Sequence, residues 1–267
     1  MRDVCVITGG GNGIGLATAK YMPKEKILVI CGRTESKLKA AAEELTALGH
    51  EVHYIVCDVS SRKDVHELCL FARSFGRIRN VIHAAGMSPS MGDPEKLVRV
   101  NAIGTKNINM EFYKYMEEGS VIVDVASNAA YQVPGFLIRK NIYSLAEKDE
   151  DAFVRKMTAE AKLPRGSYRQ SGLAYALSKN FAVWYARKCA HEYGEKGIRV
   201  CSVSPGLVDT DMGRLEEKEA GKMLGKTAEK RMGTASELGF CIASAADERN
   251  GYLTGADILA DGGCISA

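Results

Sequence analysis

Tyr175 and Lys179 are the two residues whose types and spacing point most directly to chemistry. They lie four positions apart at the start of an apolar, helix-patterned run, so on a helix both side chains share one face. A free tyrosine has a pKa of about 10, and a nearby ammonium favours the phenolate and lowers that pKa. Such a tyrosine can exchange a proton with an alcohol or carbonyl oxygen, which is half of an alcohol oxidation. An isolated pair of this kind is more often an ordinary helix surface, so the interpretation needs a hydride acceptor elsewhere in the chain.

Residues 8–15 are rich in glycine and directly follow a β-branched run. Glycines at such a turn let a pyrophosphate approach the backbone and sit on the N-terminus of the next helix. A strict G-x-G-x-x-G fails because Ile14 or Leu16 takes the place of the third glycine. A phosphate loop of the G-x-x-x-x-G-K-S/T type fails because Leu16 follows Gly15. The remaining pattern, T-G-x-x-x-G-x-G, predicts a dinucleotide-binding turn, with a plain glycine-rich turn as the alternative.

Short β-branched runs alternate with longer amphipathic runs along the chain. Strands that are apolar on both faces, with helices between them, are typical of a parallel sheet covered on both sides. The alternation predicts a single α/β domain over residues 1–267, with a Rossmann-type, doubly wound parallel sheet whose ligand crevice lies at the carboxyl ends of the strands. The predicted strands are residues 4–7, 27–30, 52–56, 81–82, 121–123, 199–203 and 258–259, and the predicted helices are residues 14–21, 36–48, 63–74, 96–116, 173–193 and 235–246.

Composition excludes several other classes of protein. The chain of 267 residues is 46% hydrophobic and 26% charged, as in an ordinary globular protein, and its net charge of +3 gives no reason to expect a nucleic-acid partner. No apolar run reaches the ~20 residues of a membrane span, so we expect no membrane partner. The eight cysteines form no C-x-x-C pair and the histidines form no ligand cluster, so we expect reduced thiols, no metal and a cytoplasmic location.

Further motifs follow the glycine loop along the chain, before and after the tyrosine–lysine pair. Together with these two features, they make the chain resemble the short-chain dehydrogenase/reductase family over nearly its whole length. One departure is His83, which replaces the first asparagine of the family's N-N-A-G and which we expect to be a packed strand-end residue. The resembling motifs are C-D-V at residues 57–59, H-A-A-G at 83–86, V-N-A at 100–102, V-A-S-N at 125–128, P-G-L-V-D-T at 205–210 and D-G-G at 261–263.

The resemblance implies a catalytic set of Asn101, Ser127, Tyr175 and Lys179. Tyr175 would exchange the proton with the substrate oxygen, and Ser127 would hydrogen-bond that oxygen and stabilise charge on it. Lys179 would lower the pKa of Tyr175 and hold the nicotinamide ribose. Asn101 would bind a water that links Lys179 to solvent. The hydride itself would belong to the cofactor, which the protein orients.

The resemblance also implies the cofactor contacts, and the loop after the second predicted strand indicates which cofactor is preferred. NAD-specific relatives carry an acidic residue there, whereas this chain has Arg33 and Thr34, which suit a 2′-phosphate. We therefore expect NADP(H) rather than NAD(H). The expected cofactor-binding residues are Gly9, Gly11, Asn12, Gly13, Ile14, Gly15, Arg33, Thr34, Asp58, Val59, Ala84, Gly86, Tyr175, Lys179, Val208 and Thr210.

An unusually long stretch, residues 131–172, separates Ser127 from Tyr175, while only a short loop, residues 87–97, precedes the helix of Asn101. This combination resembles the 3α-hydroxysteroid dehydrogenase/carbonyl reductase branch of the family, which implies a hydroxysteroid, bile-acid or other bulky substrate. A broad carbonyl or 3-oxoacyl reductase is the alternative enzyme. A dinucleotide-binding redox sensor is the alternative outside the enzymes, although such relatives usually lack the tyrosine or the lysine.

Two segments are expected to border the substrate. Residues 131–172 are predicted to be an inserted helical segment with a capping box at residues 144–147 and an apolar stripe of Phe153, Val154, Met157 and Ala161. The stripe would face the cleft, a second subunit of a homodimer or homotetramer, or the chain's own domain. Residues 210–230 mix glycines, charges and apolar side chains, which is typical of a substrate lid.

Overall fold

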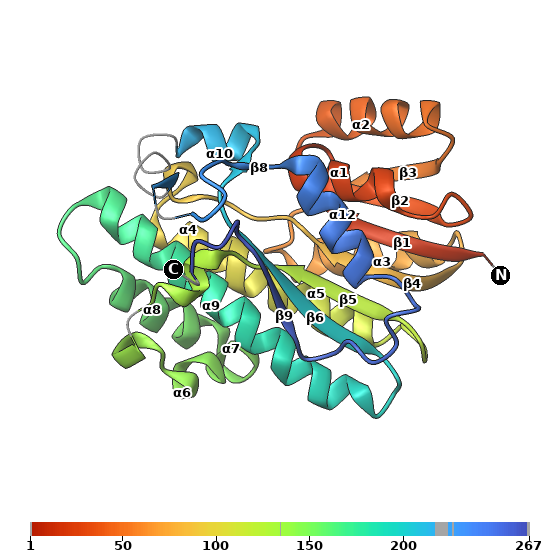
Figure 1. Cartoon of the computed structure of the whole chain (residues 1–267). Helices are drawn as coiled ribbons and strands as arrows, with labels where there is room; N and C mark the ends of the chain where they lie inside the picture. The colour runs from red at the N-terminus through yellow and green to blue at the C-terminus, as the bar shows by residue number, and fades with distance from the viewer. Residues whose placement is uncertain (1, 134, 217–223, 226, 266–267) are drawn as a thin grey trace.

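The computed structural model describes residues 2–133, 135–216, 224–225 and 227–265, and it is built around one parallel sheet of seven strands (Figure 1). The sheet order is β3-β2-β1-β4-β5-β6-β9, and every neighbouring pair is parallel. The strands are β1 (Asp3–Thr8), β2 (Ile27–Gly32), β3 (Glu51–Val56), β4 (Arg77–His83), β5 (Val121–Val125), β6 (Arg199–Pro205) and β9 (Asp257–Ala260). The predicted Rossmann-type fold is confirmed, and each predicted strand lies within one of these seven.

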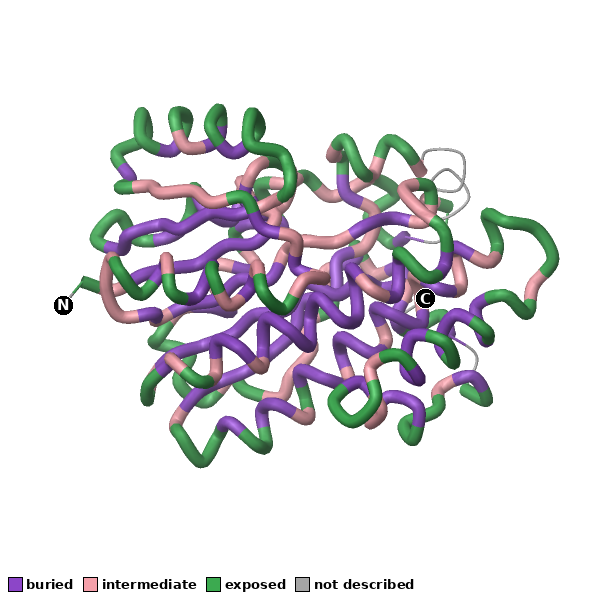
Figure 2. The backbone as a smooth tube through the Cα atoms, turned by 180° about the vertical axis from the view of Figure 1, so that it is seen from behind, coloured by how far each residue is buried: buried purple, intermediate pink, exposed green. Residues whose placement is uncertain are grey.

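Helices cover both faces of the sheet, because the central strands are apolar on both sides. The buried side chains form two large clusters, one on each face. Figure 2 shows the strands as the buried centre of the chain and the outer helix faces as exposed. One face carries α1 (Gly13–Tyr21), α2 (Glu35–Ala47) and α12 (Ala235–Ala245), and the other carries α3 (Arg62–Arg73), α4 (Pro94–Val98), α5 (Gly104–Tyr113) and α9 (Ser167–Gly194).

The strand order reverses between β1 and β4, and this reversal places the site. In an open α/β sheet the ligand crevice lies outside the carboxyl ends of the strands at such a point. The loop after β1 holds the glycine turn, and the loop after β4 holds Ala84 and Gly86. Smaller elements complete this edge of the molecule. They are η1 (Pro89–Met91), η2 (Arg99–Ile103), η3 (Asn128–Tyr131), β7 (Val208–Asp209), β8 (Gly233–Thr234) and α10 (Asp211–Leu215).

The helix that carries Tyr175 begins earlier than predicted, at Ser167 rather than near residue 173. Tyr175 therefore lies two turns inside α9. The charged and polar start of this helix lacks the apolar periodicity used for the prediction. Side-chain hydrogen bonds stabilise it instead. The Ser171 hydroxyl donates to the distant Gly92 carbonyl, and the Gln170 amide donates to the Pro164 carbonyl just before the helix.

The insertion folds as the short elements η4 (Gly135–Leu137), α6 (Lys140–Tyr143) and α7 (Leu145–Lys148), followed by α8 (Glu150–Ala161). The predicted capping box is wrong, because the Ser144 hydroxyl donates to the Asn141 carbonyl and caps no helix. Asp149 caps α8 instead, by accepting a hydrogen bond from the Ala152 N–H at 2.9 Å. A carboxylate at this position also matches the positive end of the helix dipole.

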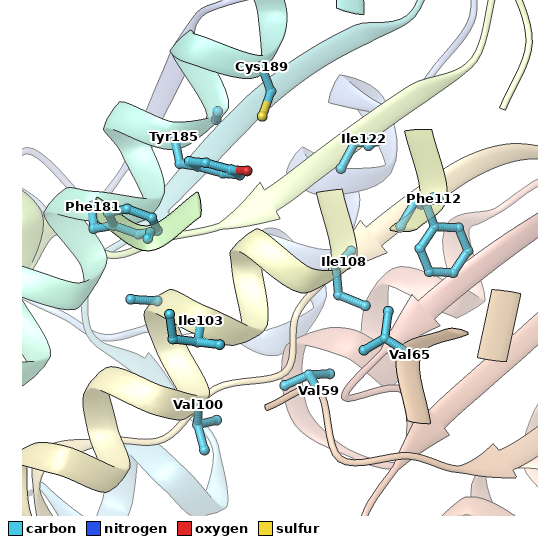
Figure 3. Close-up of a cluster of buried hydrophobic side chains, with 14 of the residues drawn as sticks. Val59, Val65, Val100, Ile103, Ile108, Phe112, Ile122, Phe181, Tyr185 and Cys189 are labelled. Carbon is cyan, nitrogen blue, oxygen red and sulfur yellow. The ribbon is translucent and has the colours of Figure 1, made fainter. Parts of the chain in front are cut away.

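The apolar stripe of α8 packs against the chain's own domain. All four stripe residues are buried and belong to the same core cluster as α4 and α9, part of which Figure 3 shows. The ring centroids of Phe153 and Phe181 are 5.0 Å apart. Polar contacts add to this packing, since the Tyr143 hydroxyl donates to Asn180 and Lys188 pairs with Glu147. The stripe was expected to face the cleft, a second subunit or the chain's own domain, and in the structure it packs against the chain's own domain.

This packing predicts a large stability effect for Phe153→Ala. The Phe153 side chain is fully buried, so its truncation removes apolar contacts and leaves a cavity, at a cost of about 3–5 kcal/mol. Phe136, in the same insertion, is 78% exposed and provides the matched control. We expect Phe136→Ala to change the free energy of unfolding by less than about 0.5 kcal/mol. Urea denaturation measures both values, and similar small values for the two variants would contradict the observed packing.

Candidate active site

A cleft of about 600 Å³ lies at the carboxyl edge of the sheet, where the strand order reverses. It collects side chains and loops from distant parts of the chain. Of the residues predicted to be catalytic or cofactor-binding, all except Asn101 line it. They are Gly9, Gly11, Asn12, Gly13, Ile14, Gly15, Arg33, Thr34, Asp58, Val59, Ala84, Gly86, Ser127, Tyr175, Lys179, Val208 and Thr210.

The glycine loop is folded so tightly that a side chain at Gly9 or at Gly15 would clash with the backbone. Gly9 has a φ of +69°, and a Cβ atom on it would lie 2.9 Å from the Ala84 carbonyl carbon. A Cβ atom on Gly15 would lie 2.4 Å from the Gly9 oxygen. The loop ends at Asn12, whose side chain makes no capping hydrogen bond to α1. The first N–H groups of α1 therefore face the cleft without a side-chain cap, which suits a pyrophosphate.

His83 is packed as predicted. The Thr8 hydroxyl accepts a hydrogen bond from the Ala85 N–H at 3.0 Å, so its own proton is free for the His83 Nδ1 atom at 2.9 Å. Burial, together with the nearby charge of Lys179, lowers the pKa of His83 to about 3. A neutral imidazole in this position links the ends of β1 and β4 without placing a charge beside the cleft.

Asp58 and Val59 form the wall of the cleft after β3. One carboxylate oxygen of Asp58 accepts hydrogen bonds from the Ser60 N–H at 2.9 Å and the Ser60 hydroxyl at 2.7 Å. Its backbone N–H donates to Asp64 at 3.1 Å. These contacts fix the loop and leave the second carboxylate oxygen of Asp58 without a described protein donor.

Tyr175 and Ser127 meet in the cleft. Ser127 is buried at the end of β5, where its hydroxyl accepts a hydrogen bond from the Ala129 N–H at 3.2 Å. It also lies close enough to the Tyr175 phenol to affect the pKa of that group. Burial raises the pKa of Tyr175 above its ordinary value, the Ser127 hydrogen bond lowers it, and the Glu216 charge raises it. The expectation that Lys179 brings the pKa of Tyr175 down is therefore not met by the protein chain itself, in which desolvation of the phenolate dominates.

Lys179 lies beside Tyr175 without donating to its hydroxyl. Its Nζ atom donates to the Val125 carbonyl at 2.8 Å and lies 5.9 Å from the centroid of the Tyr175 ring. Burial lowers the pKa of Lys179 to about 8, and the charge of Asp124 acts in the opposite direction. The ammonium is therefore buried next to the phenol and has hydrogen-bonding capacity beyond its one carbonyl contact.

Asn101 lies behind the cleft rather than in its wall. It sits in η2, a π-helical turn, and its side chain is 1% exposed. The Asn101 side chain accepts from the Met87 N–H at 2.8 Å and donates to the Met87 carbonyl at 3.0 Å, so it fixes the loop after β4. π-helical turns are frequent at functional sites. Because the oxygen and the nitrogen of the Asn101 amide are both bound to the Met87 backbone, we infer that the side chain holds this loop rather than a water.

The cofactor end of the cleft is open to a phosphate. Arg33 is exposed, and within the described part of the chain no carboxylate pairs with it. Thr34 precedes α2, and its hydroxyl makes no capping hydrogen bond. At the opposite end Val208 is buried, and the Thr210 hydroxyl accepts from the Gly213 N–H at 3.1 Å. Donors at one end of the cleft and a fixed loop at the other suit a bound dinucleotide.

The predicted lid can be located only in part. Met212 and Leu215 of α10 line the cleft, and Leu215 is 60% exposed. Residues 217–223 and 226, among them Met223, lie outside the described residues.

Two carboxylate side chains near the catalytic group were not predicted. Glu216 bridges the mouth of the cleft, since it accepts from the Ser90 N–H at 2.9 Å and from the Tyr168 hydroxyl at 2.7 Å. Asp124 lies fully buried on β5, and its charge acts on Lys179. Nothing in the sequence distinguishes Glu216 from the other charged residues of its segment. A signal for Asp124 was present, because it is a lone carboxylate within an apolar strand.

Comparisons with known proteins identify the family of the chain. The family model of short chain dehydrogenases matches residues 3–162, and that of enoyl-(acyl carrier protein) reductases matches residues 163–264. The chain thus belongs to the short-chain dehydrogenase family, and it is an NAD(P)-dependent oxidoreductase acting on alcohol or ketone groups. This assignment replaces the redox-sensor alternative. In the described part of the chain, no helix is long and apolar enough to cross a membrane.

Relatives of several activities resemble the chain along its whole length. A short-chain dehydrogenase/reductase of Alternaria brassicicola is 27% identical and is covered over 96% of its length by 99% of this chain. A 3-oxoacyl-(acyl-carrier-protein) reductase of Chlamydia muridarum is 28% identical, with 98% and 97% of the two chains covered.

Solved structures share the fold. The 3-oxoacyl reductase of Brucella melitensis in complex with NAD has a TM-score of 0.78 at 23% identity, covering 100% of this chain and 98% of the other. A short chain dehydrogenase of Burkholderia cenocepacia in complex with NADP has a TM-score of 0.77 at 22% identity, covering 98% and 97%.

Proposed function

We propose that the protein interconverts a secondary alcohol and a ketone with NADP(H), using Tyr175 as the acid–base group. The observation that supports this most is that Ser127, Tyr175 and Lys179 line one cleft together with the glycine loop. The bound nicotinamide supplies or accepts the hydride. Tyr175 gives a proton to the ketone oxygen during reduction and takes it back during oxidation.

The other proposed catalytic residues orient and stabilise these groups. Ser127 hydrogen-bonds the substrate oxygen and the phenol, so it aligns both before the proton moves. Lys179 presents a buried ammonium to the phenol and to the ribose hydroxyls. Asn101 holds the loop at Met87 and thereby shapes the wall beside Lys179.

The preference for NADP(H) rests on Arg33. An exposed guanidinium with no carboxylate partner among the described residues can pair with a 2′-phosphate and lie against the adenine. Thr34 and Lys37 line the same end of the cleft. An acidic residue at this position would instead suit the ribose 2′-hydroxyl of NAD(H).

Replacing Arg33 by serine is expected to weaken NADP(H) binding about ten- to hundredfold, because a charge-assisted contact is worth about 1.5–3 kcal/mol. NAD(H) binding should hardly change. Lys39→Ser is the matched control, since Lys39 is an exposed cation of α2 that does not line the cleft. Values of kcat/KM with both cofactors measure the effect. An equal loss for both cofactors would argue against a 2′-phosphate contact.

A hydroxysteroid or bile acid is the substrate class we propose. Apolar side chains suited to a bulky ring system line the substrate side of the cleft, namely Met87, Met91, Met212 and Leu215. A broad carbonyl or 3-oxoacyl reductase is the second candidate, supported by the named activity of the Chlamydia muridarum relative. A panel of steroids, bile acids, simple ketones and a 3-oxoacyl thioester separates the two by kcat/KM. A thioester preferred over every steroid would favour the second candidate.

We propose that the protein is a cytoplasmic homo-oligomer whose subunit contacts avoid the middle of α9. All eight cysteines are free thiols and seven are buried, as suits a reducing compartment. The insertion covers Phe181 and Tyr185 on α9, so these two side chains are not available to a partner subunit. Light scattering gives the number of subunits.

A further inference from the structure

One carboxylate joins three segments of the chain at the mouth of the cleft. These segments are η1 after β4, the start of α9 and the end of α10. The Oε1 atom of Glu216 accepts from the Ser90 N–H at 2.9 Å, and its Oε2 atom accepts from the Tyr168 hydroxyl at 2.7 Å. Because each oxygen is bound to a different segment, the carboxylate cannot turn away from the cleft without losing a hydrogen bond.

Tyr168 shows how far this carboxylate lies from the proposed acid–base group. Tyr168 and Tyr175 are seven residues apart on α9, which is almost two full turns, so their side chains leave the same face of the helix. At a rise of about 1.5 Å per residue, the two positions are about 10 Å apart along the axis. Both side chains line the cleft. A ketone whose oxygen meets Tyr175 and whose body extends about 10 Å towards the mouth therefore ends beside Glu216.

The charges that line the cleft differ between its two ends. Arg33 and Lys37 follow β2 and lie at the cofactor end, and Lys179 lies in the middle beside the phenol. At the mouth, the charged side chains among the described residues that line the cleft are Asp211 and Glu216, and both are acidic. The far end of a long substrate therefore meets negative charge.

Glu216 is held in its ionised form. Burial raises the pKa of Glu216, but hydrogen bonds from Tyr168 and Ser90 outweigh this effect, so the pKa lies below its ordinary value. Apolar side chains, Met91 and Leu215, line the same part of the cleft. Such surroundings screen a charge less than water does, so a second anion placed here is repelled more strongly than it would be in solution.

We propose that Glu216 makes the cleft favour ketones whose far end is uncharged over ketones that carry an anionic group there. The inference rests on the proposed function, in which Tyr175 serves the ketone oxygen. It narrows the proposed substrates to neutral ring ketones. A bile acid with a free carboxylate, or an acyl thioester whose carrier bears a phosphate, is placed at a disadvantage by the same repulsion.

A matched pair of substrates tests the effect of charge: a 3-oxo bile acid with a free side-chain carboxylate, and the same molecule as its carboxamide. We expect kcat/KM to be about tenfold higher for the carboxamide with the wild-type protein. Glu216→Gln removes the charge and keeps the size, so it should bring the two values together by raising kcat/KM for the acid. Glu216→Lys should reverse the preference. Raising the ionic strength should narrow the ratio for the wild-type protein, because salt screens the repulsion.

Two control variants separate this charge from other effects. Tyr168→Phe removes one hydrogen bond at the mouth and leaves the carboxylate, so the carboxamide-to-acid ratio should stay close to that of the wild-type protein. Glu192→Gln neutralises a carboxylate near the other end of α9 and should not move the ratio.

A ratio unchanged by Glu216→Gln, or changed equally by Tyr168→Phe, would overturn the proposal. Absence of turnover with every ketone would instead count against the proposed function. In that case the affinities of the acid and the carboxamide for the cofactor-bound protein, measured by calorimetry, would still test Glu216, and equal affinities in the wild-type protein would overturn its role.

Discussion

Tyr175→Phe is expected to lower kcat/KM for ketone reduction by about 10²–10⁴-fold, the usual contribution of a positioned acid–base group. The substitution removes only the phenol hydroxyl, whose pKa Ser127 lowers, and leaves the ring in place. Cofactor affinity, measured by the fluorescence of the reduced nicotinamide, should stay within a few-fold of the wild-type value. The loss should therefore fall on kcat, as expected for a group that acts mainly in the transition state.

Tyr113→Phe is the matched control for this loss. Tyr113 stacks on Tyr193, with ring centroids 4.1 Å apart, and does not line the cleft. Removal of the Tyr113 hydroxyl should leave kcat/KM unchanged. Equal rates for Tyr175→Phe and Tyr113→Phe would remove Tyr175 from the mechanism.

Gly15→Ala is expected to have the second largest effect, a loss of dinucleotide affinity of about 10²-fold. The new Cβ atom would lie 2.4 Å from the Gly9 oxygen, so the loop must move. A displacement of about 1 Å at such a site can cost a hundredfold. Because Gly9 itself touches the Ala84 backbone, the movement would reach the end of β4.

Gly11→Ala tests whether the effect comes from this contact or from any added methyl group in the loop. A Cβ atom on Gly11 would make an ordinary contact of 3.4 Å with the Leu38 side chain. We expect less than a tenfold change in affinity, measured by fluorescence titration with NADPH. If both variants bound the cofactor as well as the wild-type protein, the glycine loop would not be its binding site.

The fold was predictable because each signal was local. Apolar strands such as β2 alternate with amphipathic helices such as α3, and these patterns fix the type of each element regardless of its neighbours. The glycine turn and the tyrosine–lysine pair could be placed at one edge of the sheet, since the carboxyl ends of parallel strands meet there.

The remaining features depend on tertiary contacts that no local pattern carries. The apolar stripe containing Phe153 needed a partner, but only the folded chain shows that the partner is Phe181 of α9. The early start of α9 depends on the hydrogen bond from Ser171 to the distant Gly92. The raised pKa of Tyr175 likewise depends on burial, which outweighs the lowering effect of Ser127.

The most direct test of the central claim is the stoichiometry of the wild-type reaction. NADPH is mixed with the protein and each ketone of the panel, and the loss of reduced-nicotinamide absorbance is compared with the alcohol formed, measured by mass spectrometry. We predict one alcohol formed for each NADPH consumed, with at least one bulky ketone. Cofactor consumption independent of every ketone, or no consumption at all, would contradict the account.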